Sequence, residues 1–227
     1  MTQPFSYAYY RGMLSAAQRD GYVLSSFREY NSGKKKTIIV RHDVDYTLNG
    51  VLDIAQIERD LDVTATYMFR VHAHEYNLFS PHAYRLLQDL QALGHEIGLH
   101  FEAPNFARVF GLCARDVLRK EKQILESLAG CSIVSGSEHR DISNSIHATP
   151  YYSELFNIHD DGFQFYAMNS KFCKEMKYLS DSNGFWREGD LLVHLGDHDK
   201  FQILTHPDWW FEDDLLLKGP YFHGLGN

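Results

Sequence analysis

The sequence has few cysteines, no long apolar run and no extended run of basic residues. Its cysteines, Cys113, Cys131 and Cys173, are odd in number and widely spaced. This excludes a disulfide framework or a cysteine-based metal site, and we expect reduced thiols. No apolar stretch approaches the length that crosses a bilayer. The first residues lack a charged segment followed by an apolar one, so we expect no signal peptide and a cytoplasmic protein.

The chain is acidic, with a formal net charge of -8 over 227 residues. Lys34-Lys35-Lys36 is a short basic run that indicates a solvated loop, so we expect no nucleic-acid partner and no membrane partner. Hydrophobic residues make up 44% of the chain, enough to bury a sizeable core. There is no internal repeat or long linker. We expect one domain over residues 1–227, in which residues 1–35 form a leading helix and loop packed on the rest.

Short apolar runs alternate with segments of helical periodicity along the chain. The runs predict strands at 37–40, 64–70, 95–100, 132–134, 164–166, 191–193 and 202–205. The periodic segments predict helices at 6–20, 49–61, 81–93 and 114–128. Such alternation is typical of parallel strands connected by helices. Seven strands favour a barrel over an open sheet.

Polar side chains capable of acid–base or metal chemistry fall repeatedly where predicted strands end. They are Arg41, His42, Asp43 and Asp45; His100 and Glu102; Glu138, His139 and Arg140; and His206. In parallel α/β folds the carboxyl ends of the strands face the active site. Four such coincidences predict a functional site at this edge of the sheet.

Asp43 and Asp45 are two residues apart, as are His100 and Glu102, so each pair faces one side of an extended chain. Two carboxylates aimed at one place repel each other unless a cation lies between them. Asp45, His100 and Glu102 together offer three nitrogen and oxygen ligands and leave a position open for water. That set predicts a catalytic divalent metal such as zinc.

Alternatives remain open for several of these residues. The acidic pair is also compatible with a solvated turn or a helix cap. His72 and His74, two residues apart after the second predicted strand, are a rival imidazole pair. His206 is placed to donate a proton or hold an oxyanion, although a lone histidine is more often structural. For the tryptophans near the C-terminus, core packing is the alternative to lining a pocket.

Five segments resemble, in order and spacing, the motifs of the polysaccharide deacetylases with the NodB homology domain, carbohydrate esterase family 4. They are Arg41-His42-Asp43-Val44-Asp45, Gly94-His95-Glu96-Ile97-Gly98-Leu99-His100, Ser137-Glu138-His139-Arg140, Asp181-Ser182-Asn183-Gly184-Phe185-Trp186-Arg187 and Leu204-Thr205-His206-Pro207. The resemblance covers residues 36–211. It implies an α/β fold in the form of a distorted seven-stranded (β/α) barrel.

The resemblance also implies roles for particular residues. Asp43 would be the catalytic base, Arg140 would orient it, and His206 would be the general acid. Asp45 and His100 would bind a divalent metal. We expect zinc, with cobalt, nickel, manganese or iron as alternatives.

The chain departs from the family pattern at one metal ligand. A second histidine usually follows four residues after the one at His100, and here that position is Pro104, which cannot bind a metal. Glu102 is the substitute that its place on the strand predicts. An additional water, a histidine such as His139, or a site that binds metal poorly are the alternatives.

We therefore expect a metal-dependent hydrolase that removes an acetyl or similar acyl group from an N-acylated sugar or related small substrate. The side chains expected to contact the substrate are Trp186, Arg187, His139 and Trp209. One alternative, motivated by Pro104, is a weak or inactive barrel that binds a carbohydrate or a partner protein. Another is hydrolysis of a different C–N bond, such as a cyclic amide, on the same scaffold.

Overall fold

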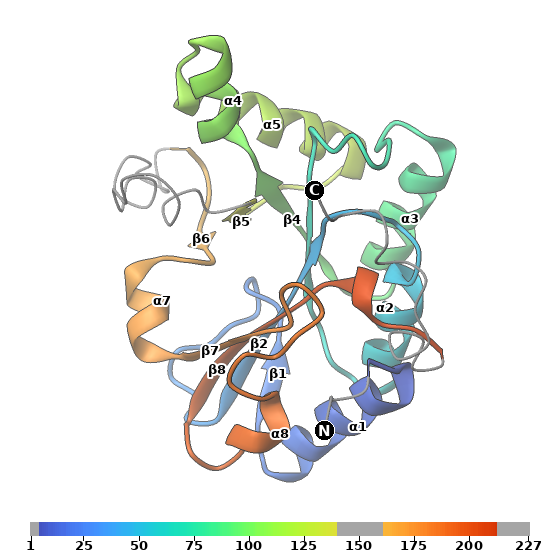
Figure 1. Cartoon of the computed structure of the whole chain (residues 1–227), viewed down its shortest axis with the longest axis vertical. Helices are drawn as coiled ribbons and strands as arrows, with labels where there is room; N and C mark the ends of the chain where they lie inside the picture. Colours follow the sequence, from blue (N-terminus) through green and yellow to red (C-terminus); the bar gives the residue numbers. More distant parts are fainter. Residues whose placement is uncertain (1–4, 140–160, 213–227) are drawn as a thin grey trace.

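The computed structural model describes residues 5–139 and 161–212, which form an α/β fold around one parallel sheet. Among these residues, seven strands follow the order β6-β5-β4-β3-β2-β8-β7, and β1 pairs with the first half of β2. The strands are β1 Val23–Ser25, β2 Thr37–Val44, β3 Thr66–Phe69, β4 Glu96–Phe101, β5 Ser135–Glu138, β6 Phe165–Tyr166, β7 Lys177–Ser180 and β8 Lys200–Thr205. The sheet curls into a half-barrel (Figure 1), which confirms the predicted fold class.

Helices connect most of these strands and bury one face of the sheet. They are α1 Tyr7–Arg19, α2 Val51–Asp60, α3 Pro81–Ala92, α4 Ala103–Phe110, α5 Ala114–Ala129, α7 Ser170–Glu175, α8 Leu191–His194 and the short 3-10 helix η2 Pro207–Trp209. Figure 1 shows α1, α2 and α3 along the same side of the sheet. Apolar residues of these helices and of α5 form a single core with the strands that they cover.

Strand β2 lies at the centre of the fold and is buried along its whole length. Its side chains alternate between the two faces, as the period of an extended chain requires. Ile38, Val40 and Val44 belong to the main core beneath the helices. Arg41 and Asp43 contact each other on the opposite face. The same strand therefore contributes to the core with one face and to a polar site with the other.

A buried charged network joins β2 to the helices behind it. The Glu58 carboxylate of α2 accepts hydrogen bonds from the hydroxyls of Tyr10 (2.6 Å) and Tyr67 (2.7 Å). The Nε2 atom of His42 lies 2.7 Å from the same carboxylate. Burial by itself would raise the pKa of Glu58, but His42 and His95 outweigh it and lower the pKa below its usual value. Glu58 is therefore ionised, and side chains from α1, β2 and β3 contact its carboxylate.

We expect Glu58→Ala to lower the free energy of unfolding by about 3–5 kcal/mol, because it leaves buried partners without their acceptor. Asp53→Ala is the matched control, since Asp53 is an exposed acidic residue of the same helix. It should change stability by no more than about 0.5 kcal/mol. Urea denaturation of both variants makes the comparison. Equal stability of the two variants would show that the network contributes nothing.

Two predicted strands are wrong. Residues 191–193 form α8, because the Asp190 side chain caps the helix by accepting a hydrogen bond from the backbone N–H of Leu192 at 3.0 Å. The strand predicted at 132–134 lies instead at β5, whose Ser-Gly-Ser-Glu sequence carries no hydrophobic signal. Small residues are needed there, since a side chain at Gly136 would meet the Phe163 ring at 3.2 Å. Strands β1 and β7 and helices α4 and α7 were not predicted.

Candidate metal centre and active site

The carboxyl ends of four strands bring the predicted site residues together. Asp43 lies within β2 and Asp45 directly after it, His100 lies in β4, His139 follows β5, and His206 follows β8. All five side chains are buried. These five side chains therefore gather where parallel strands end, which is the edge of the sheet at which the sequence predicts a site.

Asp45, His100 and His139 form a group that could hold a metal ion. Each offers one ligand atom, and these atoms all lie within 4.8 Å of one another. The Oδ1 atom of Asp45 lies 3.3 Å from His100 Nε2 and 3.8 Å from His139 Nε2. That oxygen is buried, and within residues 5–139 and 161–212 it has no hydrogen-bond partner. Two imidazole nitrogens and a carboxylate oxygen are a donor set that suits zinc and leaves positions open, so the residues fit a divalent metal.

Both imidazoles are held by their other ring nitrogen. His100 Nδ1 lies 2.7 Å from Ser137 Oγ and 3.2 Å from the Ser137 carbonyl oxygen. His139 Nδ1 lies 2.5 Å from Glu102 Oε1. A carboxylate or carbonyl partner favours the tautomer that carries its proton on Nδ1, which leaves the Nε2 lone pair available. Histidines that bind metals are usually oriented in this way.

Glu102, the expected third ligand, lies behind His139 and outside this group. Its carboxylate accepts hydrogen bonds from Arg70 Nε (3.0 Å) and Arg70 Nη2 (2.7 Å). Burial raises the pKa of Glu102, but His139 and Arg70 together lower it to about 2. The structure thus brings His139 to the position proposed for Glu102. The site of the missing family histidine, Pro104, lies in the first turn of α4.

Asp43 is held by an arginine from its own strand. Arg41 donates to Asp43 Oδ1 from Nε (2.8 Å) and to Oδ2 from Nη2 (2.6 Å), and both side chains are buried. Burial favours a raised pKa for Asp43, but Arg41 and His100 outweigh it and lower the pKa. The sequence predicted Arg140 for this role, and Arg140 lies outside the described residues. The spacing of two residues that paired Asp43 with Asp45 could also have identified Arg41.

His206 is paired with a buried carboxylate. Its Nδ1 lies 2.6 Å from Asp181 Oδ1, and its backbone N–H also donates to this carboxylate. Trp210 Nε1 donates to Asp181 Oδ2 at 2.8 Å. Burial would lower the pKa of His206, but Asp181 outweighs it and raises the pKa to about 9. His206 Nε2 lies 3.7 Å from Asp45 Oδ2, so a protonated imidazole faces the metal group.

The remaining predicted residues lie in different surroundings. Trp186 is only 3% exposed and belongs to the core, whereas its neighbour Phe185 is 62% exposed. Trp209 is half-buried, and its ring centroid lies 6.4 Å from that of His206. Arg187 is exposed and lines a pocket beside β7. Asp181 lies in the fourth motif of the sequence, which assigns it no role. Its contact with His206 could not be predicted from residue types alone.

The rival histidine pair is not assembled into a site. The His74 side chain is 82% exposed and contacts Glu75. His72 stacks on Phe106, with ring centroids 4.4 Å apart, and its Nε2 lies 3.2 Å from Glu121. The two imidazoles therefore have separate partners.

Comparison with known proteins bears on the fold. No family model matches the sequence, and neither does any curated protein. A carbohydrate esterase family 4 pseudoenzyme from Bacillus anthracis is similar, with a TM-score of 0.51 and 16% identity over 78% of this chain and 56% of that chain. The catalytic domain of a Eubacterium rectale peptidoglycan N-acetylglucosamine deacetylase is similar with a TM-score of 0.53 and 14% identity, over 79% of each chain. A Streptococcus pyogenes deacetylase in complex with acetate is similar with a TM-score of 0.50 and 12% identity. The match covers 93% of this chain and 86% of that chain.

The chain therefore has the polysaccharide deacetylase fold that the five motifs predicted. It spans little more than half the length of the pseudoenzyme chain, 56%. Across the described parts of the chain, none of the helices has the length and apolar character to cross a membrane.

Proposed function

We propose that this protein is a metal-dependent hydrolase that removes an acetyl or similar acyl group from an N-acylated sugar or related small molecule. The observation that carries the proposal is the buried group Asp45, His100 and His139, flanked by an ionised Asp43 and a protonated His206. A base and an acid on either side of a metal-ligand set is the arrangement that hydrolysis of an unreactive amide requires. The deacetylases among the similar structures support the same reaction class.

In this proposal Asp45, His100 and His139 hold the metal. A divalent ion there, zinc by its preference for this donor set, would act as a Lewis acid toward an acyl carbonyl and a bound water molecule. Arg70 stabilises the arrangement from behind, because it donates to the Asp45 carbonyl oxygen at 2.6 Å and also binds Glu102. The metal ligands are thus fixed before substrate arrives.

Asp43 accepts the proton of the attacking water. Arg41 occupies one lone pair on each carboxylate oxygen, and each oxygen keeps another with which to accept. His206 donates a proton from Nε2 to the departing amine, while Asp181 holds Nδ1. Trp209, beside His206, contributes an apolar wall at the leaving-group side.

Acetate release tests the proposal directly. Protein loaded with zinc, cobalt, nickel, manganese or iron is incubated with N-acetylglucosamine, its phosphates, its nucleotide-linked form and short N-acetylated oligosaccharides. We expect metal-dependent release of acetate that a chelator abolishes. A metal-loaded protein that deacetylates none of these compounds would contradict the proposal. Within it we place the enzyme in the cytoplasm, where nucleotide-linked or lipid-linked sugars are substrates within reach.

Pro104 motivates the alternative of an inactive binding module. His139 offers the metal-ligand group a nitrogen that Pro104 cannot, and this favours the hydrolase. The pairing of His206 with a fully buried carboxylate also favours catalysis, because a binding surface has no need of a protonated imidazole in this position. Metal analysis of the purified protein separates the two functions.

The alkaline limit of activity should depend on Asp181. A general acid acts only while protonated, so the wild-type rate should fall above about pH 9, the pKa to which Asp181 raises His206. Asp181→Asn removes the negative charge, and the pKa of His206 should fall toward the ordinary value of about 6.5. We expect the alkaline limb of the kcat–pH profile to move down by about two pH units. Asp197→Asn, an exposed change between α8 and β8, should leave the profile in place. An unmoved limb in Asp181→Asn contradicts the role of His206.

A further inference from the structure

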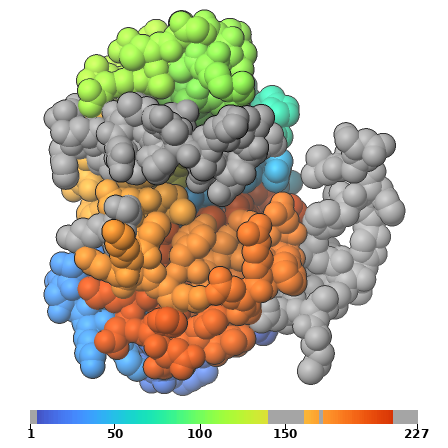
Figure 2. All heavy atoms as spheres, turned by 60° about the vertical axis from the view of Figure 1, so that its left-hand side comes forward, coloured from blue at the N-terminus to red at the C-terminus, as the bar shows by residue number. Residues whose placement is uncertain are grey.

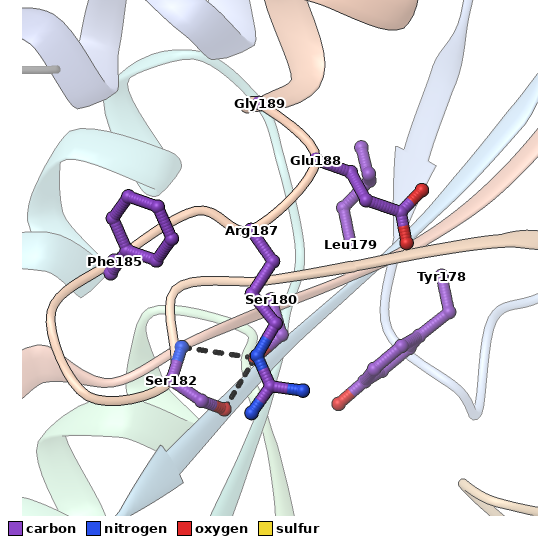
Figure 3. A pocket seen from close by; sticks show the side chains of 8 residues that line it. All are labelled: Tyr178, Leu179, Ser180, Ser182, Phe185, Arg187, Glu188 and Gly189. Atoms are coloured by element: carbon purple, nitrogen blue, oxygen red, sulfur yellow. Dashed lines mark hydrogen bonds between the residues drawn. The ribbon is translucent and has the colours of Figure 1, made fainter.

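A pocket of about 200 Å³ lies beside β7, and no step of the proposed mechanism uses it. Its lining side chains come from β7 and the loop that follows (Figure 3): Tyr178, Leu179, Ser180, Ser182, Phe185, Arg187 and Glu188, with Gly189. Figure 2 shows this segment, in orange, at the surface of the molecule. The pocket is therefore open to a molecule that approaches from solvent.

The strand register places the pocket on the same face of the sheet as the proposed base. Ser180 is aligned with Leu204 of β8, and Leu204 with Arg41 of β2. Aligned residues of neighbouring parallel strands point to the same face, so Ser180 shares the face of Arg41 and Asp43. Burial raises the pKa of the Tyr178 phenol, and Arg41 and Asp43 act on it in opposite directions. Ser180 and Tyr178 of the pocket thus face the same side of the sheet as Arg41 and Asp43.

The pocket is rich in hydrogen-bond donors. Ser180 Oγ and Ser182 Oγ lie 2.6 Å apart, and the backbone N–H of Ser182 donates to Ser180 Oγ at 3.1 Å. Ser180 also hydrogen-bonds the Tyr178 phenol, so the three hydroxyls share two contacts and one of their three protons remains to bind a ligand. Figure 3 shows the Arg187 side chain extending between Ser182 and Tyr178. A guanidinium, a serine hydroxyl and a phenol therefore border one small space.

Arg187 brings a positive charge to the lining of this pocket. Among residues 5–139 and 161–212, no ion pair is found for Arg187, and the neighbouring acid Glu188 is paired with Lys177. The chain as a whole carries a formal charge of -8, which repels anions. An exposed guanidinium beside hydroxyls matches the geometry and charge of phosphate oxygens.

We propose that this pocket binds a phosphate group of the substrate. The inference rests on the proposed function and deepens it, because it assigns the substrate to the phosphorylated N-acyl sugars, whether simple phosphates, nucleotide-linked or lipid-linked. Arg187 and the hydroxyls of Ser180 and Tyr178 bind the phosphate oxygens. The acyl group of the same molecule then lies over Asp43 and the metal ligands.

Calorimetric titration of the metal-loaded protein with two probes tests the inference: N-acetylglucosamine 1-phosphate and the neutral methyl glycoside of N-acetylglucosamine. Hydrogen bonds to charged groups contribute a factor of about 10 to 100 in binding. We expect wild type to prefer the phosphorylated sugar by such a factor and Arg187→Gln to lose most of this preference. Arg85→Gln removes an exposed arginine of α3 and should retain it.

Equal affinity of wild type for the two probes overturns the inference. So does a preference that survives Arg187→Gln, because the phosphate must then bind elsewhere, as at the metal itself. The measurement needs no turnover, so it separates the two proposals. A preference that depends on Arg187, in a protein that releases no acetate, supports the phosphate site and contradicts the deacetylase.

Discussion

Replacing Asp43 by asparagine is expected to lower kcat by about 10²–10⁴-fold, the usual cost of losing a general base. The amide keeps the shape of the carboxylate but cannot take a proton from water. Arg41, which donates to both carboxylate oxygens, would keep only one acceptor. The measurement is the rate of acetate release with the best substrate found, at saturating concentration.

The control for Asp43→Asn is metal content, which should equal that of wild type because Asp43 lies outside the ligand group. Thermal unfolding should show that the variant is folded. Asp53→Asn, an exposed change in α2, should have wild-type kcat. Retention of the wild-type rate contradicts the role of Asp43 as base, and loss of the metal makes Asp43 a ligand instead.

His139→Ala is expected to weaken zinc binding more than Glu102→Gln does. His139 offers a ligand atom to the group, whereas Glu102 only orients that imidazole. Loss of such an orienting partner typically costs about 10–100-fold in metal affinity, and loss of the ligand itself should cost more. Competition with a chromophoric chelator measures both affinities.

The variant that loses more zinc affinity identifies the metal ligand. If Glu102→Gln loses more affinity than His139→Ala, the carboxylate is the ligand, as its place on the strand first predicted. Glu75→Gln is a matched control, because Glu75 also contacts Arg70 but offers no atom to the group. It should bind zinc as wild type does.

Much of the fold could be predicted from the sequence, because apolar runs and helical periodicity are local patterns. The apolar run before Arg41 and the helical periodicity of α2, α3 and α5 each depend on a few neighbouring residues. Strand β5 gave no such signal, because its four residues are small or polar and are buried only by packing from elsewhere. Strand β7, with Lys177 at its start and Ser180 at its end, sits at the edge of the sheet and is only partly buried.

The site was predictable where spacing alone determines which residues face one another. Asp43 and Asp45, two residues apart, are the example, and Arg41 follows the same rule. The choice between Glu102 and His139 was not predictable in this way, because it depends on Arg70, directly after β3, which binds the Glu102 carboxylate. The pairing of Asp181 with His206 likewise joins the ends of two strands, β7 and β8, of which one was not predicted.

The proposed metal centre is tested most directly by an anomalous difference map from crystals of the zinc-loaded protein, collected at the zinc absorption edge. We expect one strong peak at bonding distance, about 2.0–2.2 Å, from His100 Nε2, His139 Nε2 and a carboxylate oxygen of Asp45. Asp43 and His206 should lie beside the peak without binding it. A peak coordinated by Glu102 in place of His139, or no peak in this group at full zinc loading, would contradict the proposed metal centre.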